Sequence, residues 1–285
     1  FSKISYCRIK LTKINFKKNV NFWELASFSK AKNFDNYLLL KQAFEQNVLI
    51  EDNKKLLEKF INSFNSFKNV KSQLYQDAFA SFIIANKYEK TFLEFGATDG
   101  LELSNSYMLE NSYDWKGVLS EPSPQWHDLL RKNRTNTKII TKCIWSESRK
   151  KLDFFMSDVG VLSTINEFIE SDKSSMPGNT LERKKSGKVI SVETISLNDV
   201  IKEYFNDVVP SYVSIDTEGS EFEILKAFSL DIYRPKVFTI EHNFTDYQNK
   251  IDQLMISHNY IRIFRDLTTF DAWYVSEETL KELDF

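Results

Sequence analysis

The sequence has few of the residues that interrupt or cross-link a chain. It contains 7 Gly, 5 Pro and 2 Cys among 285 residues, against 24 Phe. Because Cys7 and Cys143 lie far apart and lack any metal-binding spacing, neither a disulfide framework nor a zinc site is indicated, and a reducing cytoplasm is the expected location. No run of about eighteen uninterrupted apolar residues occurs, so no transmembrane segment is expected. This composition favours a globular protein with bulky cores and few loop breakers.

Charge is divided unevenly along the chain. Residues 1–72 contain 14 Lys and Arg against 6 Asp and Glu, a net charge of +8, and the remainder contains 24 against 34, a net charge of −10. Amphipathic patterns at residues 37–43 and 56–67 indicate short helices. We therefore expect a basic, mostly helical extension over residues 1–71 and a second domain over residues 72–285. The extension could attract a phosphorylated or carboxylated acceptor or an anionic membrane surface; a solvated helical face explains it as well.

The second domain is organised around an apolar stretch that stops at a glycine. It reads Thr91-Phe-Leu-Glu-Phe-Gly-Ala-Thr-Asp-Gly100 and predicts a buried strand followed by a tight loop. The spacing Glu-x-Gly-x-x-x-Gly differs from the Gly-x-Gly-x-x-Gly of dinucleotide binders, so a ligand without a phosphate, such as S-adenosylmethionine, fits better. A carboxylate inside an apolar strand needs partners, so we expect Glu94 to face a cationic or hydrogen-bonding ligand. The candidate cofactor residues here are Glu94, Gly96, Ala97, Thr98, Asp99 and Gly100.

Candidate ligand contacts continue into the next helix and strand. A helix is predicted over residues 103–110, and Ser104 and Asn105 near its start could bind a ligand carboxylate; helix capping explains them equally. Glu121, followed by Pro122, ends the next predicted strand about twenty residues beyond the glycine loop. A carboxylate at that place commonly binds both hydroxyls of a ribose, which is the role that we expect for Glu121.

The middle of the chain offers an adenine contact and a lid. A third strand is predicted over residues 138–145, and Trp145 and Ser146 at its end are expected beside the adenine; a core role for Trp145 fits the same pattern. A polar segment with charges of both signs follows at residues 158–188. Long loops in compact domains are often lids, so this segment is the candidate lid over the acceptor.

Two later predicted strands also end in acids. The fourth ends at Asp216, and the fifth ends at Glu241 and His242. Alternation of strands and helices predicts an α/β domain with a mostly parallel sheet and right-handed crossovers. Because ligands bind at the carboxyl ends of such strands, we expect Asp216, Glu241 and His242 to share one edge with Glu94 and Glu121.

Several short segments of the second domain together carry a family signature. They are Tyr75-Gln-Asp77, Phe92-Leu-Glu-Phe-Gly-Ala-Thr-Asp-Gly100 with Ser104-Asn105, Glu121-Pro-Ser-Pro124, Thr194-Ile-Ser-Leu-Asn-Asp199, Ile215-Asp-Thr-Glu-Gly-Ser-Glu221 and Phe270-Asp-Ala-Trp-Tyr274. From about residue 72 onward the chain resembles the FkbM family of S-adenosylmethionine-dependent methyltransferases. Glu94 and Thr98 stand where that family commonly has Asp and Asn. The resemblance implies a class I methyltransferase fold, a Rossmann-like, mostly parallel seven-stranded sheet with helices on both faces. It also implies methyl transfer to an oxygen.

The expected function is O-methylation of a sugar or surface-glycan precursor, a carbohydrate modification of the kind used in polysaccharide biosynthesis. A sugar hydroxyl is a poor nucleophile at neutral pH, so a base is needed. His242 is the candidate base, and a structural role for it is equally open; Asp216 could orient that base, bind the acceptor or join a metal. No metal is expected, but Asp216, Glu241 and His242 would hold one if present.

Two alternatives remain open from the residues. One is a nicotinamide-dependent oxidoreductase that uses Glu121 on its ribose, against which the missing third glycine argues. The other is a non-catalytic carbohydrate-binding or scaffold module. For the methyltransferase we expect S-adenosylmethionine as cofactor and a small-molecule or glycan acceptor that could be phosphorylated or nucleotide-linked. We expect no nucleic-acid partner, and a homo-oligomer is compatible with the sequence.

Overall fold

The computed structural model describes residues 53–85 and 87–283. The helix predicted at residues 37–43, and most of the basic extension expected over residues 1–71, lie outside the described residues. The chain divides into two units after Asn65, a few residues before the expected boundary.

The described part of the first unit is helical. It forms α3 (Lys54–Ser63), which is followed by a 3-10 turn, η1 (Phe64–Ser66). The side chains of Leu57 and Phe60 are buried, and the rings of Phe60 and Phe64 pack edge to face with centroids 5.0 Å apart. The amphipathic helix predicted over residues 56–67 is confirmed.

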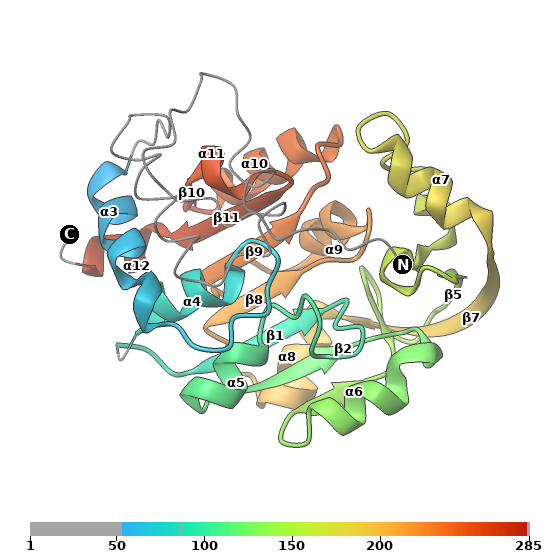
Figure 1. Ribbon diagram of the computed structural model, residues 1–285, viewed down its shortest axis with the longest axis horizontal. Coiled ribbons are helices and arrows are strands. Elements are labelled where there is room, and N and C mark those ends of the chain that lie inside the picture. Colours follow the sequence, from blue (N-terminus) through green and yellow to red (C-terminus); the bar gives the residue numbers. More distant parts are fainter. Residues whose placement is uncertain (1–52, 86, 284–285) are drawn as a thin grey trace, which may run out of the picture. The chain divides into compact units, whose positions relative to one another are not determined.

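The second unit is built on a seven-stranded sheet (Figure 1). The strand order is β10-β11-β9-β8-β1-β2-β3; β11 runs antiparallel to both neighbours, and all other pairs are parallel. The predicted class I methyltransferase fold is confirmed, with one reversed strand in the sheet. The strands are β1 (Thr91–Phe95), β2 (Lys116–Ser120), β3 (Lys138–Ile140), β8 (Tyr212–Ile215), β9 (Val237–Glu241), β10 (Tyr260–Ile263) and β11 (Asp271–Ser276).

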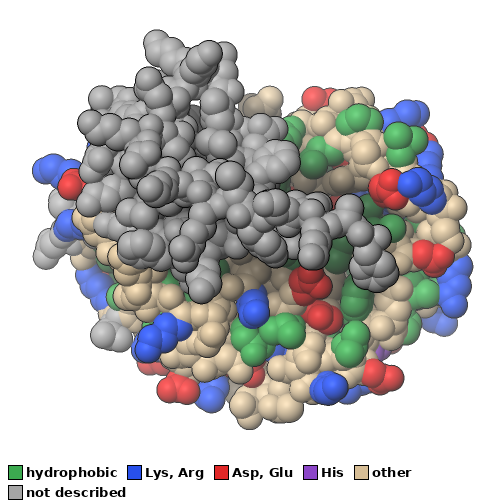
Figure 2. Space-filling view, viewed as in Figure 1, with side chains coloured by type: hydrophobic (Ala, Val, Ile, Leu, Met, Phe, Trp, Pro, Cys, Tyr) green, Lys and Arg blue, Asp and Glu red, His purple; other side chains and the backbone are tan. Residues whose placement is uncertain are grey.

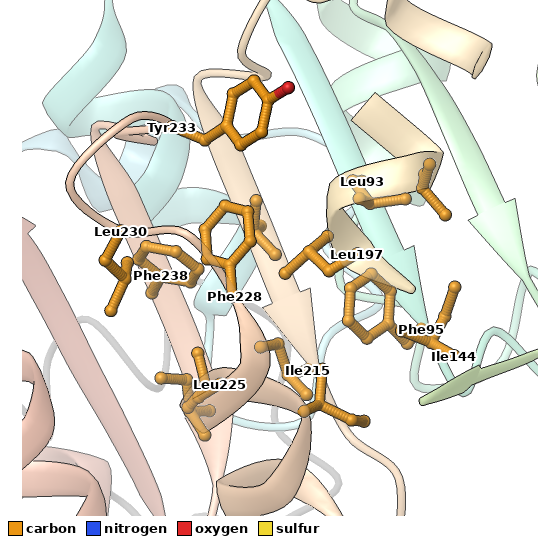
Figure 3. Packing of buried hydrophobic residues seen from close by; sticks show 14 of the residues in the cluster. Leu93, Phe95, Ile144, Leu197, Ile215, Leu225, Phe228, Leu230, Tyr233 and Phe238 are labelled. Atoms are coloured by element: carbon orange, nitrogen blue, oxygen red, sulfur yellow. The ribbon is translucent and has the colours of Figure 1, made fainter. Parts of the chain in front are cut away.

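Helices cover both faces of this sheet. On one face, α8 (Leu197–Phe205), α9 (Glu221–Ala227) and α10 (Tyr247–Ser257) pack on alternate strand residues such as Leu93 and Phe95 (Figure 3). Successive strand residues point to opposite faces, so Phe92 and Glu94 face the other layer. There Phe79 of α4 (Gln76–Ile84) stacks on Trp273 of β11, with ring centroids 4.5 Å apart.

The remaining helices are short. They are α5 (Tyr107–Tyr113), α6 (His127–Asn133) after the 3-10 turn η2 (Pro124–Trp126), α11 (Arg265–Thr268) and α12 (Glu277–Glu282). Ser196 caps α8, because its hydroxyl oxygen accepts a hydrogen bond from the backbone N–H of Asp199 at 3.1 Å. Among the described helices, none has the length and apolar character to span a bilayer.

A second, four-stranded sheet contains the chain between β3 and β8. Its order is β4-β7-β5-β6, with β4 (Cys143–Trp145), β5 (Lys151–Ser157), β6 (Thr164–Ile165) and β7 (Gly187–Ser196). The third strand predicted over residues 138–145 is therefore wrong as one element: its first half is β3, and its second half pairs with β7. The polar pair Thr141 and Lys142 interrupts the apolar run at the point of division.

The segment expected as a lid, residues 158–188, is folded and is not a long loop. It contains β6, the 3-10 turns η3 (Gly160–Leu162) and η4 (Asn166–Phe168), and α7 (Pro177–Lys185). Arg183 of α7 is completely buried, and its guanidinium binds the Asp172 carboxylate at 3.0 Å. Buried charges persist only when they are paired in this way. A lid role for this segment remains a proposal.

Candidate active site

One cavity of about 230 Å³ lies at the carboxyl ends of β1, β2, β8 and β9. The loop after β1 forms one wall, and three acids from the ends of β8 and β9 form another. A third wall comes from the folded insertion, residues 160–165 with Met176 and Asn179. On the face drawn in Figure 2, acidic side chains lie beside hydrophobic ones near the middle of the molecule. The lining of the cavity is acidic at Asp216, Glu218 and Glu241 and apolar at Val161, Leu162 and Met176.

Gly96 holds the loop after β1 against the end of β8. Its φ is +71°, and a Cβ at this position would lie 1.9 Å from the backbone oxygen of Asp216. Thr98 also has a positive φ, +47°, which is unusual for a β-branched residue. Strain of this kind costs about 1–3 kcal/mol per residue and clusters at ligand sites.

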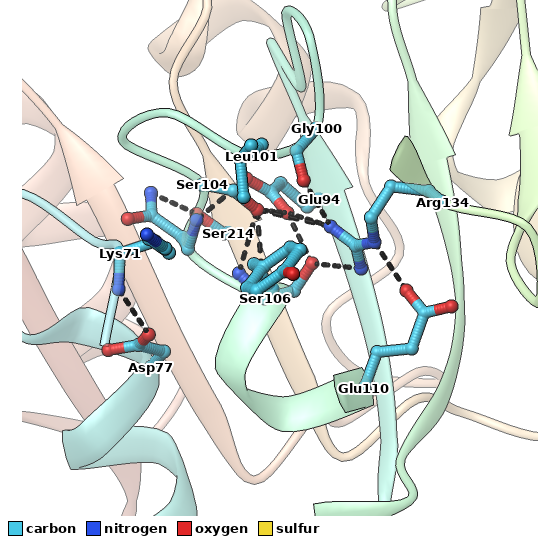
Figure 4. A network of polar contacts seen from close by, with 12 residues as sticks. Lys71, Asp77, Glu94, Gly100, Leu101, Ser104, Ser106, Glu110, Arg134 and Ser214 are labelled. Carbon is cyan, nitrogen blue, oxygen red and sulfur yellow. Dashed lines mark hydrogen bonds and ion pairs between the residues drawn. The ribbon is translucent and has the colours of Figure 1, made fainter. Parts of the chain in front are cut away.

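Glu94 is held by groups of the protein itself (Figure 4). Its carboxylate accepts hydrogen bonds from the backbone N–H of Asn105 at 2.8 Å and from the hydroxyls of Ser104, at 3.1 Å, and Ser106. The Arg134 guanidinium lies 3.9 Å away and also binds Ser106. Burial raises the pKa of Glu94, and Arg134 opposes that shift. The carboxylate lines the cavity, but it mainly fixes the segment that follows the glycine loop.

That segment explains why the helix predicted over residues 103–110 begins only at Tyr107. Leu103 has a φ of +59°, which a helix does not accommodate. Ser104 and Asn105 are buried and line the cavity. The carboxamide nitrogen of Asn105 donates to the Ser214 hydroxyl of β8 at 2.9 Å, whereas its carboxamide oxygen has no hydrogen-bond partner among the described residues.

Glu121 lies at the end of β2, buried in the cavity wall. One carboxylate oxygen accepts the backbone N–H of Thr98 at 2.9 Å, and the other accepts that of Ser123 at 2.7 Å. Burial raises the pKa of Glu121 to about 7. Each carboxylate oxygen offers a second lone pair, so the group can accept further hydrogen bonds from a ligand.

Four candidate cofactor residues lie away from the cavity. The Asp99 carboxylate accepts the backbone N–H groups of Leu101 and Glu102, both at 2.9 Å, and so closes the turn. A Cβ on Gly100 would lie 2.5 Å from Leu130, so this glycine serves packing. The structure also does not bring Trp145 and Ser146 to the wall. Cys143 and Ile144 of β4 line it instead, next to Pro122.

Three carboxylates, Asp216, Glu218 and Glu241, form an acid cluster at the ends of β8 and β9. One oxygen from each lies within 4.8 Å of the others. Burial raises the pKa of Asp216 to about 7, and the charges of Glu221 and Asp271 add to the shift. Burial and neighbouring carboxylates also raise the pKa of Glu218 and of Glu241 well above the usual range. The cluster is therefore ready to accept protons or to bind cations.

His242 follows this cluster in sequence but does not line the cavity. Its Nδ1 accepts the backbone N–H of Phe244 at 3.1 Å, and its Nε2 lies 3.1 Å from a guanidinium nitrogen of Arg262. Burial, aided by the Arg262 charge, lowers the pKa of His242 to about 4. Both ring nitrogens are occupied by protein groups, which disagrees with the expected role of His242 as the catalytic base.

Comparison with known proteins decides the family. A family model described as a methyltransferase FkbM domain matches residues 94–270. The chain belongs to the FkbM methyltransferase family. Its cofactor is S-adenosylmethionine, and the family assignment favours methyl transfer over the oxidoreductase and scaffold alternatives. No relative was found among curated proteins.

Solved structures similar to this FkbM methyltransferase include three methyltransferases. An O-methyltransferase from Bacillus cereus in complex with SAH is 12% identical, covers 78% of this chain and 91% of its own, and gives a TM-score of 0.38. An SAH-bound methyltransferase from Podospora anserina is 11% identical, covers 86% of this chain and 97% of its own, and gives a TM-score of 0.36. A precorrin-6y C5,15-methyltransferase from Geobacter metallireducens is 14% identical, covers 68% of this chain and 76% of its own, and gives a TM-score of 0.37.

The residues of this FkbM methyltransferase fit its cofactor. Gly96 lets the loop after β1 lie against the end of β8 at the cavity wall, Glu121 keeps free lone pairs, and Cys143 and Ile144 offer an apolar surface that an adenine could contact. The sequence analysis gave no role to several other residues of the cavity, most of which come from turns or from the insertion: Gln73, Leu103, Phe154, Val161, Met176, Asn179, Glu218, Asn243 and Phe270. Glu218 and Phe270 stand in the family-signature segments, Glu218 as the second acid of Asp216-Thr-Glu218.

Proposed function

We propose that this FkbM methyltransferase methylates a hydroxyl oxygen of a sugar or surface-glycan precursor. One observation supports this proposal: a single cavity combines the glycine loop and Glu121 with the acid cluster of Asp216, Glu218 and Glu241. The loop suits the cofactor, and the acids suit a hydroxyl acceptor. We keep the cytoplasm, where activated sugars are available, as the proposed location.

Glu94, Ser104, Asn105 and Glu121 are the residues that we assign to cofactor binding. Glu121 accepts hydrogen bonds from the two ribose hydroxyls, and Ser104 and Asn105 lie where a carboxylate or amine of the ligand can bind. S-adenosylmethionine supplies a methyl group bound to a positively charged sulfur. Glu94 acts indirectly, because it fixes the backbone of Ser104 and Asn105.

For the acceptor, the proposed role of the acid cluster is to remove the proton of the hydroxyl that is methylated. The acceptor oxygen forms a bond to the methyl carbon as the bond between that carbon and sulfur breaks, and the hydroxyl proton must leave. Asp216 lines the cavity with a pKa of about 7, which suits proton transfer at neutral pH. General-base catalysis typically contributes about 10² to 10⁴ in rate. Asp216 therefore replaces His242 as the proposed base.

A sugar fits the remaining walls of the cavity. Asn179, Asn243 and Ser163 offer groups that donate to and accept from hydroxyls, whereas Val161 and Met176 offer apolar surface for the faces of a pyranose ring. Such mixed walls are typical of small-molecule sites with fixed orientation. The basic residues before position 72 would favour a phosphorylated or nucleotide-linked form.

Calorimetry tests the cofactor half of the proposal. The protein should bind S-adenosylmethionine and not NAD, and Glu121→Gln should weaken that binding by about 1–3 kcal/mol, because one oxygen that accepts hydrogen bonds is lost. Asp128→Asn is the matched control and should leave the affinity unchanged, because Asp128 is exposed on α6 and lies outside the cavity. Equal affinities of wild type and Glu121→Gln would exclude the ribose assignment.

A screen for methyl incorporation tests the acceptor half. Labelled methyl from S-adenosylmethionine should appear in nucleotide sugars or polysaccharide precursors that carry free hydroxyls. Amines, thiols and proteins offered at the same concentration should remain unlabelled. Labelling confined to an amine or thiol would overturn the O-methyl proposal while leaving the family assignment intact.

A further inference from the structure

The acid cluster is built by two neighbouring parallel strands and the turn after one of them. Ile215 of β8 pairs with Ile240 of β9, so Asp216 and Glu241 leave the sheet side by side. Glu218 approaches from the turn between β8 and α9. The oxygens of all three lie within 4.8 Å of one another, and all three line the cavity. Such a set concentrates oxygen ligands on one point.

The described residues provide little positive charge to balance this cluster. Of the ion pairs in that part of the chain, one reaches it: Arg183 binds Glu218 at 2.8 Å. Arg183 also pairs with Asp172 at 3.0 Å, so its charge is shared. The carboxylate of Glu241 accepts a neutral donor, the carboxamide of Asn243, at 2.8 Å. Negative charge left in a partly buried site favours a bound cation.

A separate observation in the same cavity comes from Asn105. This residue is 5% exposed, and its carboxamide oxygen has no hydrogen-bond partner among the described residues. The carboxamide nitrogen is anchored on Ser214, two residues before Asp216. Asn105 lines the main cavity and an adjoining narrow recess, and Asp216 and Glu241 line both of them as well. A buried polar atom without a partner calls for a ligand.

We propose that Asp216, Glu218, Glu241 and the carboxamide oxygen of Asn105 hold a divalent cation such as Mg²⁺ or Mn²⁺. Carboxylate and carbonyl oxygens are the ligands that these hard cations prefer, and the absence of His and Cys from the set disfavours zinc. Four protein oxygens leave two of the six positions of an octahedral site for the acceptor. A vicinal diol of a sugar can occupy both positions.

This inference rests on the proposed function and defines how the acid cluster performs it. A cation bound to the acceptor hydroxyl lowers the pKa of that hydroxyl and fixes its oxygen. The hydroxyl proton then passes to water, and Asp216 acts as a ligand of the cation instead of as the base. The acceptor class narrows accordingly to compounds with two neighbouring oxygens.

Binding of manganese to the full chain tests the cation site. After dialysis against EDTA, titration with MnCl₂ followed by the electron paramagnetic resonance of free Mn²⁺ should show one saturable site. Asp216→Asn and Glu241→Gln should each weaken binding at least tenfold, and Asn105→Ala should weaken it severalfold. Glu182→Gln is the matched control, because Glu182 pairs with Lys185 on the exposed side of α7, and its binding should equal that of wild type.

Three results would overturn the inference. The first is the absence of a saturable Mn²⁺ site in wild type. The second is equal binding by wild type and by Asp216→Asn and Glu241→Gln, with thermal melts confirming that the variants are folded. Methyl transfer to a hydroxyl that persists undiminished in EDTA would also overturn it, yet would uphold the proposed function. Conversely, one Mn²⁺ site in a protein that methylates amines alone would overturn the proposed function while supporting the cation site.

Discussion

Gly96 and Asp216 are in direct backbone contact, and this contact joins the glycine loop to the acid cluster. A Cβ on Gly96 would lie 1.9 Å from the carbonyl oxygen of Asp216, far inside van der Waals contact. β1 and β8 are neighbouring parallel strands, so their carboxyl ends are held in register, and the glycine lets the two loops cross at that level. The cofactor loop and the proposed acceptor groups thus have one fixed geometry.

Substitution of Gly96 by alanine should destabilise the protein and damage the site. The new methyl group cannot be accommodated without moving the Asp216 backbone, and overpacking of this kind costs about 1–3 kcal/mol. We expect a lower midpoint of thermal unfolding together with weaker binding of S-adenosylmethionine. Gly178→Ala in α7 is the matched control, because a Cβ there meets nothing within 4 Å and alanine favours a helix. Its stability should equal or exceed that of wild type.

The stability of the ligand-free protein should fall as the pH rises from about 4 to 7. Burial raises the pKa of Asp77 to about 6 and those of Glu121 and Asp271 to about 7. Between their unfolded and folded pKa values these groups bind more protons in the native state, so the free energy of unfolding decreases with pH. His242 has the opposite effect: its pKa is lowered to about 4, so between about pH 4 and 6.5 the unfolded state binds one more proton at this residue, and this contribution to the free energy of unfolding increases with pH.

Thermal melts at intervals of pH between 5 and 7.5 measure this effect. The midpoint should be highest at the acidic end, and Glu121→Gln should reduce its slope with pH, since each pKa unit corresponds to about 1.4 kcal/mol. A midpoint that rises steadily toward pH 7.5 would contradict the assignment of these buried acids.

Turnover should depend on Asp216 far more than on His242. With an acceptor identified by the screen, Asp216→Asn should lower kcat by about 10² or more, whether the carboxylate removes a proton or binds a cation. His242→Gln should reduce kcat less than about tenfold, since His242 lies outside the cavity against Arg262 and Phe244. Its main effect should be a lower midpoint of unfolding. A loss of turnover in His242→Gln equal to that in Asp216→Asn would restore His242 as the base.

Much of the fold could be predicted from local pattern. Apolar runs that end in Gly or an acid predicted β1, β2, β8 and β9, and the alternation with helices predicted that these strands run parallel. Acids at the ends of those strands reach one edge for the same reason. Glu121, Asp216 and Glu241 accordingly line one cavity, whereas His242, expected at the same edge, does not.

What a side chain does at that edge depended on residues distant in sequence. Glu94 lies in an apolar strand, but its carboxylate is paired with Arg134 and accepts hydrogen bonds from hydroxyls of the following segment. His242 has the expected strand position, but Arg262 of β10 lies against its ring. Trp145 left the predicted edge because β4 pairs with β7 and not with the main sheet. Tertiary partners of this kind leave no periodic signal in the chain.

The last prediction concerns the insertion, which Arg183 ties to the acid cluster. Its buried guanidinium binds Asp172, Glu218 and the carbonyl oxygen of Leu162, the last at 2.8 Å. Arg183→Met should lower the free energy of unfolding by about 3–5 kcal/mol, because the buried carboxylate of Asp172 and the partly buried carboxylate of Glu218 lose their partner. Lys185→Met in the same helix is the matched control; its exposed pair with Glu182 is worth at most about 1 kcal/mol.

Amide hydrogen exchange localises that effect and tests the proposed lid. In Arg183→Met, exchange should accelerate across residues 158–188 more than in the main sheet, because the ties of the insertion are lost there. In wild type the same residues should exchange more slowly once S-adenosylmethionine and an acceptor are bound, since the insertion lines the cavity. Exchange that is equally slow with and without ligands would identify the insertion as a fixed wall. Uniform acceleration over the whole sheet in Arg183→Met would show that Arg183 supports the entire domain and not the insertion alone.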